Sequence, residues 1–262
     1  MCTAWEEKTM RKLLSVIYYE YLMQLKRIAT WAVLAAAVVI SLIDSFPSAK
    51  NLARLEFLSE PSYFIFRTLS FGALLTAFGL MFLLSNRMSV DRKTGMKSLI
   101  MASPVTKHQY ILGKLLGGFI YIFTVFFLYL ALNIIVFFLF VPTDVSFSDC
   151  TIPFFRALII CALPFSIFIS FTSIALPAIV DARLFYVLAS VLFIINAASV
   201  ESADKMPFYL ITSGDLKKLI WLHPKYPYIN TDGILPNLMF LLVCGLISAV
   251  PLFLRRKFWR NG

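Results

Sequence analysis

The sequence predicts an all-α membrane protein with six transmembrane helices. Hydrophobic residues make up 60% of the 262 positions, and the mean hydropathy is +0.83. Charged residues make up only 15%, whereas soluble domains carry about 25%. Apolar runs near or above the length needed to cross a bilayer recur along the chain, separated by shorter polar segments. We therefore expect residues 1–262 to form a single transmembrane domain.

The first predicted element is an amphipathic helix over residues 11–27. Its apolar residues recur at helical spacing, while basic residues and Glu20 occupy the remaining positions. Such a helix is suited to the plane of the lipid headgroups, although an ordinary cytosolic lead-in helix is the alternative. The apolar run that follows begins too late and is too long for a cleaved signal peptide. The apolar positions are Leu13, Leu14, Ile17, Tyr18, Tyr21, Leu22 and Leu25.

Six apolar runs account for the expected spans. The first is close to the lower length limit of about 17 residues, and the third exceeds what the hydrocarbon core requires, so we expect it to tilt or protrude. Arg67 lies near the start of the second and can extend to the interface. Pro164 and Pro177 are expected kink sites in the fourth. The predicted spans are residues 28–43, 63–84, 115–141, 154–180, 184–200 and 234–253.

Polar segments connect these runs. Residues 201–232 mix charges with apolar pieces too short to cross a bilayer, which predicts an extracellular segment with interfacial or re-entrant helices. Residues 91–114 form a basic segment between spans two and three. Within it, we expect a short helix over residues 97–102, a break at Ser103 and Pro104, and a new helix near Thr106.

The positions of the basic residues predict the orientation. Sixteen of the 24 Lys and Arg residues fall in the two termini, in residues 87–114 and at Arg183. The remaining eight fall in the alternate segments. Because cytoplasmic segments are enriched in Lys and Arg, we expect a multi-pass protein of the cell membrane with both termini and residues 91–114 in the cytoplasm.

Several functional classes are disfavoured by what the sequence lacks. No expected span carries an ionisable residue near its middle, which weighs against proton-coupled transporters and charged channels. There is no GxSxG, no HExxH and no acidic metal-binding cluster, so we expect neither an enzyme nor a metal site. Four cysteines without CxxC spacing predict no disulfide framework. Composition also disfavours a nucleic-acid partner. The phosphate-binding pattern GxxxxGK[ST] is absent as well.

Residues 91–118 resemble the cytoplasmic signature of ABC-2-type exporter permeases. That signature combines an acidic and basic cluster with a glycine, an apolar run, a Ser-Pro pair, and a Gly-Lys pair that opens the third span. Lys93 and Met96 depart from the family pattern, in which an acid and a threonine are usual. The six spans and the amphipathic N-terminal helix are also similar to that family. The matching positions are Asp91, Arg92, Gly95, Leu99, Ser103, Pro104, Tyr110, Leu112, Gly113 and Lys114.

The resemblance implies a transmembrane subunit that exports cargo when coupled to a separate cytosolic ATPase. Two permease chains, identical or homologous, pair within membrane lipid. A coupling helix between spans two and three docks in a cleft of each ATPase, and ATP and Mg²⁺ are bound by the ATPase rather than by this chain. The docking residues it implies are Asp91, Arg92, Lys93, Gly95, Lys97, Ser98, Leu99, Ile100, Met101, Ser103 and Pro104. Alternatively, the basic residues among them serve only to orient the chain.

We expect an amphipathic or hydrophobic cargo, such as a peptide, antibiotic or lipid-like molecule, because the walls of the path would be largely apolar. The same small polar residues that we assign to this path also serve helix packing in membranes. The candidate path residues are Thr124, Asn133, Ser170, Thr172 and Asn196. The alternative functions are a membrane scaffold or sensor that recruits a cytosolic protein without transport, and, with few candidate catalytic groups, a membrane-embedded enzyme.

Overall fold

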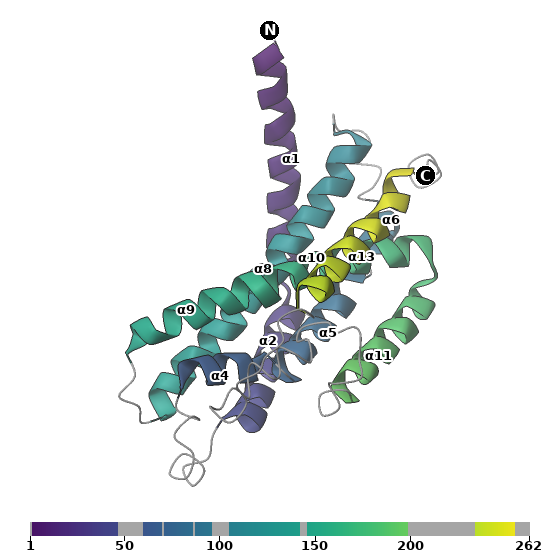
Figure 1. Cartoon of the computed structure of the whole chain (residues 1–262). Coiled ribbons are helices and arrows are strands. Elements are labelled where there is room, and N and C mark those ends of the chain that lie inside the picture. Colours follow the sequence, from purple (N-terminus) through teal and green to yellow (C-terminus); the bar gives the residue numbers. More distant parts are fainter. Residues whose placement is uncertain are drawn as a thin grey trace.

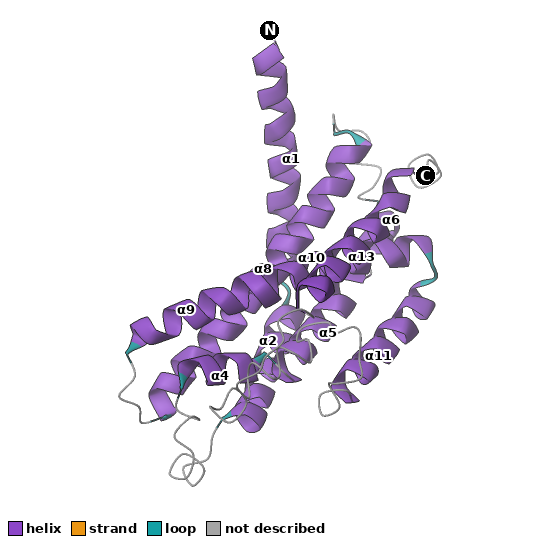
Figure 2. Ribbon diagram, viewed as in Figure 1, coloured by secondary structure: helices purple, strands orange, loops and turns teal. Residues whose placement is uncertain are grey.

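Helices make up all the regular structure in the part of the chain that the structure describes (Figure 2). This computed structural model describes residues 2–46, 60–69, 71–85, 87–95, 105–141, 146–198 and 234–254. The all-α prediction is confirmed for these ranges. The predicted segment 201–232, the predicted short helix over residues 97–102 and the basic C-terminal tail lie outside the described residues.

The N-terminal helix is longer than predicted and is followed by a sharp bend. Helix α1 (Cys2–Leu25) begins before residue 11, and α2 (Ile28–Ser45) covers the expected first span. The two helices meet at an angle of 61°. Two side chains of α2 bond carbonyls at the end of α1: the Thr30 hydroxyl donates to Gln24 O at 2.9 Å and the Trp31 indole to Leu25 O at 3.0 Å. These hydrogen bonds stabilise the bend between α1 and α2.

The predicted second span contains two helices, α4 (Pro61–Thr68) and α5 (Phe71–Ser85). The Tyr129 hydroxyl donates a 2.7 Å hydrogen bond to the carbonyl of Thr68 at the end of α4. A carbonyl freed at the end of a helix inside an apolar bundle needs such a donor. Helix α6 (Arg87–Lys93) follows, and the chain turns at Gly95, whose φ of 70° suits glycine.

Helix α8 (Lys107–Phe140) contains the predicted third span and extends beyond its N-terminal side. Thr106 caps the helix: its hydroxyl accepts from Gln109 N at 3.3 Å, and the Gln109 side chain accepts from Thr106 N at 2.9 Å. This reciprocal pair satisfies two backbone donors that a helix start leaves unpaired. The predicted helix start near Thr106 is confirmed.

The fourth apolar run forms one long helical unit that begins earlier than predicted. It comprises α9 (Phe147–Ala157), a π-helical turn η2 (Leu158–Ala162) and α10 (Leu163–Ile179). The predicted start at residue 154 is wrong, because Ser146 and Asp149 form a capping box that starts the helix at Phe147. The π-turn lies directly before Pro164, where a proline removes a helical hydrogen bond. Helices α11 (Ala182–Ala198) and α13 (Ile234–Leu254) cover the last two runs.

Two helical units of the described chain are long and apolar enough to cross a membrane by length and composition: Lys107–Phe140 and Phe147–Ile179. Residues 10–25 and 28–43 add a third if the bent pair is counted as one span. Shorter apolar helices are present at 72–85, 182–197 and 238–254. These features are compatible with membrane association.

Helix α8 contacts most of the other long helices. Its N-terminal half packs against α1 and its middle against α10, and α13 runs beside α10 (Figure 1). The α1 contact is close because Gly113 and Gly117 face it: a Cβ on Gly117 would lie 2.9 Å from Ile17 O. At the same end of the bundle, the Lys107 ammonium donates to Phe253 O at 2.6 Å, near the end of α13. Small residues thus permit α1 to dock on α8.

The substitution Gly117→Val is expected to weaken this packing. Its Cβ would lie 2.8 Å from Glu20 Cβ and 2.9 Å from Ile17 O, so α1 must shift. Overpacking of this kind costs about 1–3 kcal/mol. Thermal unfolding of the detergent-purified chain should show a lower midpoint for Gly117→Val than for the control Leu112→Val, which introduces the same side chain at an exposed position of α8. Equal midpoints would contradict the inferred close contact.

Candidate functional site

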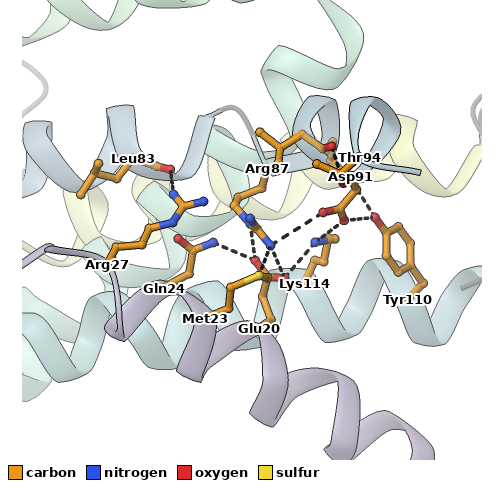
Figure 3. Close-up of polar contacts among 12 residues, drawn as sticks. Glu20, Met23, Gln24, Arg27, Leu83, Arg87, Asp91, Thr94, Tyr110 and Lys114 are labelled. Atoms are coloured by element: carbon orange, nitrogen blue, oxygen red, sulfur yellow. Dashed lines mark hydrogen bonds and ion pairs between the residues drawn. The ribbon is translucent and has the colours of Figure 1, made fainter. Parts of the chain in front are cut away.

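Four charged side chains meet in the interior where α1, α6 and α8 come together. They are Glu20 from α1, Arg87 and Asp91 from α6, and Lys114 from α8, and we call them the charge cluster (Figure 3). None of the four residues is more than 5% exposed. Groups of this kind are almost never fully buried unless they are paired.

Each cation of the charge cluster lies close to both acids. Arg87 Nε donates to Glu20 Oε1 at 2.7 Å, and Arg87 Nη2 lies 3.8 Å from Asp91 Oδ1. Lys114 Nζ lies 2.8 Å from Glu20 Oε2 and 2.6 Å from Asp91 Oδ2. Two positive and two negative side chains form a closed ring with no net charge. Removing any one member would leave a buried charge without full compensation.

Neutral side chains complete the hydrogen bonding of the two acids. Gln24 Nε2 donates to Glu20 Oε1 at 2.9 Å, and the Tyr110 hydroxyl donates to Asp91 Oδ2 at 2.6 Å. Figure 3 shows Met23 beside Arg87, whose Nη2 is 3.2 Å from Met23 Sδ. The buried Gln24 Oε1, by contrast, has no hydrogen-bond partner within the described ranges. The bonds to the two acids favour one relative arrangement of the three helices, because satisfied buried polar groups rigidify a structure.

Helical spacing explains how the sequence builds the cluster. Arg87 and Asp91 are four residues apart on α6, and Tyr110 and Lys114 are four apart on α8, so each pair lies on one face of its helix. Glu20 reaches them because Gly117 leaves room for it: a Cβ on Gly117 would lie 2.8 Å from Glu20 Cβ. The site thus depends on two i,i+4 pairs and one close helix contact.

The pKa of Glu20 reflects its two cationic neighbours. Burial by itself raises the pKa of this carboxyl, but the charge of Lys114, the hydrogen bond from Arg87 and its charge outweigh burial and lower the pKa to about 2. Glu20 lies on α1, before the apolar run of α2. Its carboxylate is therefore ionised at neutral pH despite being buried.

The predicted docking residues divide between described and undescribed parts of the chain. Asp91 belongs to the charge cluster, so its carboxylate is directed into the chain and bonds Lys114 and Tyr110. Arg92 and Lys93 are the last residues of α6, and Gly95 forms the turn after it. The docking role remains a prediction for all of them. The predicted residues outside the described chain are Lys97, Ser98, Leu99, Ile100, Met101, Ser103 and Pro104.

The five predicted path residues come from α8, α10 and α11 and bond backbone carbonyls. Thr124, Asn133, Thr172 and Asn196 each donate to a carbonyl of their own helix, four residues earlier, and Ser170 donates across to Leu115 O at 2.8 Å. The amide oxygen of the buried Asn133 has no hydrogen-bond partner among the described residues. Such bonds serve helix packing as well as a path, so the path assignment remains a prediction.

Sequence reasoning missed Glu20 and Arg87 as site residues. Glu20 was expected on the polar face of the amphipathic helix, but it is buried against α8. One signal was available: Glu20 is the only acid between residues 11 and 43, and it follows Val16 and Ile17 at spacings of four and three. An acid on the apolar face of a helix indicates a cationic partner.

In the part of the chain that the structure describes, no group of three or more His, Cys, Asp or Glu side chains is placed to hold a metal ion. Comparison of the chain with protein-family models, curated proteins and solved structures finds no match. The functional interpretation therefore depends on the geometry of the site together with the sequence signature of residues 91–118.

The substitution Glu20→Gln is expected to destabilise the chain strongly. It keeps the shape of the side chain but leaves Arg87 and Lys114 with one acid between them. Breaking a buried pair costs about 3–5 kcal/mol. Thermal or denaturant unfolding in detergent measures the loss, with Arg156→Gln as the control because Arg156 is exposed on α9. A loss no larger than that of Arg156→Gln would refute the pairing.

Stability should also depend on pH through Glu20. Because its pKa falls from an ordinary value of 4.5 to about 2 on folding, the contribution of its ionised form is fully present above pH 4.5 and is lost as the pH falls through 2. The difference in unfolding midpoint between the native chain and Glu20→Gln should narrow over that interval. A difference that stays constant from pH 5 to pH 2 would contradict this assignment.

Proposed function

We propose that this chain is the transmembrane permease subunit of an ATP-driven ABC-2-type exporter. In this proposal α2, the α4 and α5 pair, α8, the unit from α9 to α10, α11 and α13 provide six crossings. Helix α1 lies at the cytoplasmic interface, and both termini face the cytoplasm of the cell membrane. Two of these units, α8 and the unit from α9 to α10, are long and apolar enough to span a membrane, and the shorter apolar helices within α5, α11 and α13 are assigned to further crossings by this proposal.

One observation carries the proposal: an ion pair joins the first residue of the segment that resembles the family signature to a residue near the end of that segment. Asp91 Oδ2 lies 2.6 Å from Lys114 Nζ, and the Tyr110 hydroxyl donates to the same carboxylate oxygen. These three residues belong to the resemblance in sequence, and they contact one another in the fold. Because buried ion pairs hold the residues on both sides of this segment, a force applied to the segment by a docked partner would be transmitted to the helices.

The charge cluster connects α6 to α1 and to α8, which supports a mechanical role for these contacts. Arg87 and Asp91 attach α6 to α1 through Glu20 and to α8 through Lys114. Separating these helices in the membrane would leave buried charges unpaired, at a cost of several kcal/mol per ion. A push on the segment after α6 would therefore move α1 and the start of α8 together with α6. Closure of an ATPase dimer bound to that segment would supply the push.

The partners follow from the same proposal. A cytosolic ABC ATPase binds ATP and Mg²⁺, and a second permease chain completes the path between the spans. The cargo in this proposal is amphipathic or hydrophobic, because the walls of a path between such apolar helices would be largely apolar. The proposal assigns no catalytic group to this chain.

The decisive experiment is affinity purification of the chain from native membranes at native levels, followed by an ATP hydrolysis assay. An associated soluble ATPase and its hydrolysis activity should be recovered. The substitution Leu99→Asp should reduce both by at least about tenfold, because an acid in an apolar contact costs more than 1.4 kcal/mol.

The matched control is Ser148→Asp, which introduces the same acid at an exposed position at the start of α9. It should leave ATPase recovery unchanged. Recovery of no ATPase, or equal recovery with Leu99→Asp and Ser148→Asp, would contradict the proposal. A recovered partner that hydrolyses no ATP would favour the scaffold or sensor instead.

A further inference from the structure

A pocket of about 290 Å³ lies between α8 and α9, away from the charge cluster. Aromatic pairs join the two helices at two levels along it: Phe127 with Phe154, whose ring centroids are 5.5 Å apart, and Phe138 with Phe147 at 5.7 Å. Between them α8 presents Ala131, whose short side chain leaves space. The lining spans residues 127–135 of α8 and 147–155 of α9, which is about 12 Å along each helix. We call this pocket the slot; Phe127 and Phe154 line it toward one end and Phe147 toward the other.

The chemistry of the lining is that of a hydrocarbon site. The pocket has no charged side chain, and its deepest residues, Ile134 and Cys150, are 6% and 3% exposed. The one hydroxyl in the lining belongs to Thr151, which bonds the carbonyl of Phe147 in its own helix. An uncharged, apolar lining favours contact with apolar groups over contact with water. A neutral hydrocarbon is therefore the matching occupant.

The rim of the slot faces outward from the bundle. Phe127, Ile135, Phe147 and Phe155 line it and are 41–69% exposed. Along α8, Phe127 and Ile135 lie 13 and 21 residues beyond Lys114, which is about 20 and 32 Å at the rise of a helix. The hydrocarbon core of a bilayer is about 30 Å thick. If α8 spans the bilayer, the slot opens into the leaflet opposite the charge cluster.

We propose that this slot between α8 and α9 is a binding site for one acyl chain of a bilayer phospholipid. An acyl chain matches the uncharged lining, and the surrounding leaflet supplies it through the open rim. The bound chain would fill the space between the two aromatic pairs and brace α9 against α8. This site is independent of the proposed ATPase docking, because it requires only that α8 and α9 contact lipid.

The test uses the full chain in phosphatidylcholine vesicles that contain a small fraction of phosphatidylcholine with a diazirine on one acyl chain. After illumination, labelled peptides are mapped by mass spectrometry. Peptides that carry residues 127–135 and 147–155 should be labelled severalfold more than the exposed, apolar α11. Equal labelling of these helices would overturn the proposal, because it would indicate ordinary contact with bulk lipid.

A matched pair of variants locates the label. Thr151→Phe places a ring in the slot and should reduce its labelling by more than half, whereas Ile152→Phe adds a ring at the next position, which is 70% exposed and does not line the slot. Ala131→Leu fills the slot from α8 and provides a second test if Thr151→Phe does not fold. Undiminished labelling in a folded slot-filling variant would refute the assignment. Labelling of the slot peptides that falls as the protein-to-lipid ratio rises would also refute the assignment, because it would indicate that a second copy of the chain occupies the slot.

Discussion

The ion pairs of Glu20 determine how α1, α6 and the start of α8 are assembled. One carboxylate on α1 binds Arg87 of α6 and Lys114 of α8, and Asp91 completes the ring. Ion pairs in the interior contribute little net stability compared with apolar packing, but they cost several kcal/mol when one partner is removed. We therefore infer that these ion pairs contribute mainly to specificity. They favour one relative position of α1, α6 and α8, whereas apolar contacts alone would permit several.

The same constraint connects the helix packing to the proposed function. Gly113 and Gly117 bring α1 against α8, and this contact carries Glu20 into reach of the two cations. Helix α6 ends at Lys93, two residues after Asp91 of the cluster, and a capping box at Thr106 starts α8. A segment fixed at both ends in this way is suited to receive force from a soluble partner and to pass it to α1 and α8 together.

The far end of the bundle is organised by different forces. There the described contacts between α8 and α9 are aromatic and aliphatic, and the slot between them carries no charge. Aromatic pairs have preferred geometries but need no hydrogen bonds, and these two pairs have interplanar angles of 72° and 39°. The described bundle thus has one end joined by buried ion pairs and another joined by apolar contacts, and the proposed function assigns the docked ATPase to the end with the ion pairs.

Periodicity and composition were sufficient to predict the all-α class, most of the helices and the helix start at Thr106, because these depend on local hydrogen bonding and apolar runs. They did not predict the early start of α9, which depends on the capping pair Ser146 and Asp149, or the division of the second span into α4 and α5. Sequence also placed Asp91 and Lys114 in one signature, but only the tertiary structure joined them to Glu20 and Arg87. The reason is physical: a buried ion pair requires side chains from distant helices to lie within about 4 Å, and no local pattern encodes that distance.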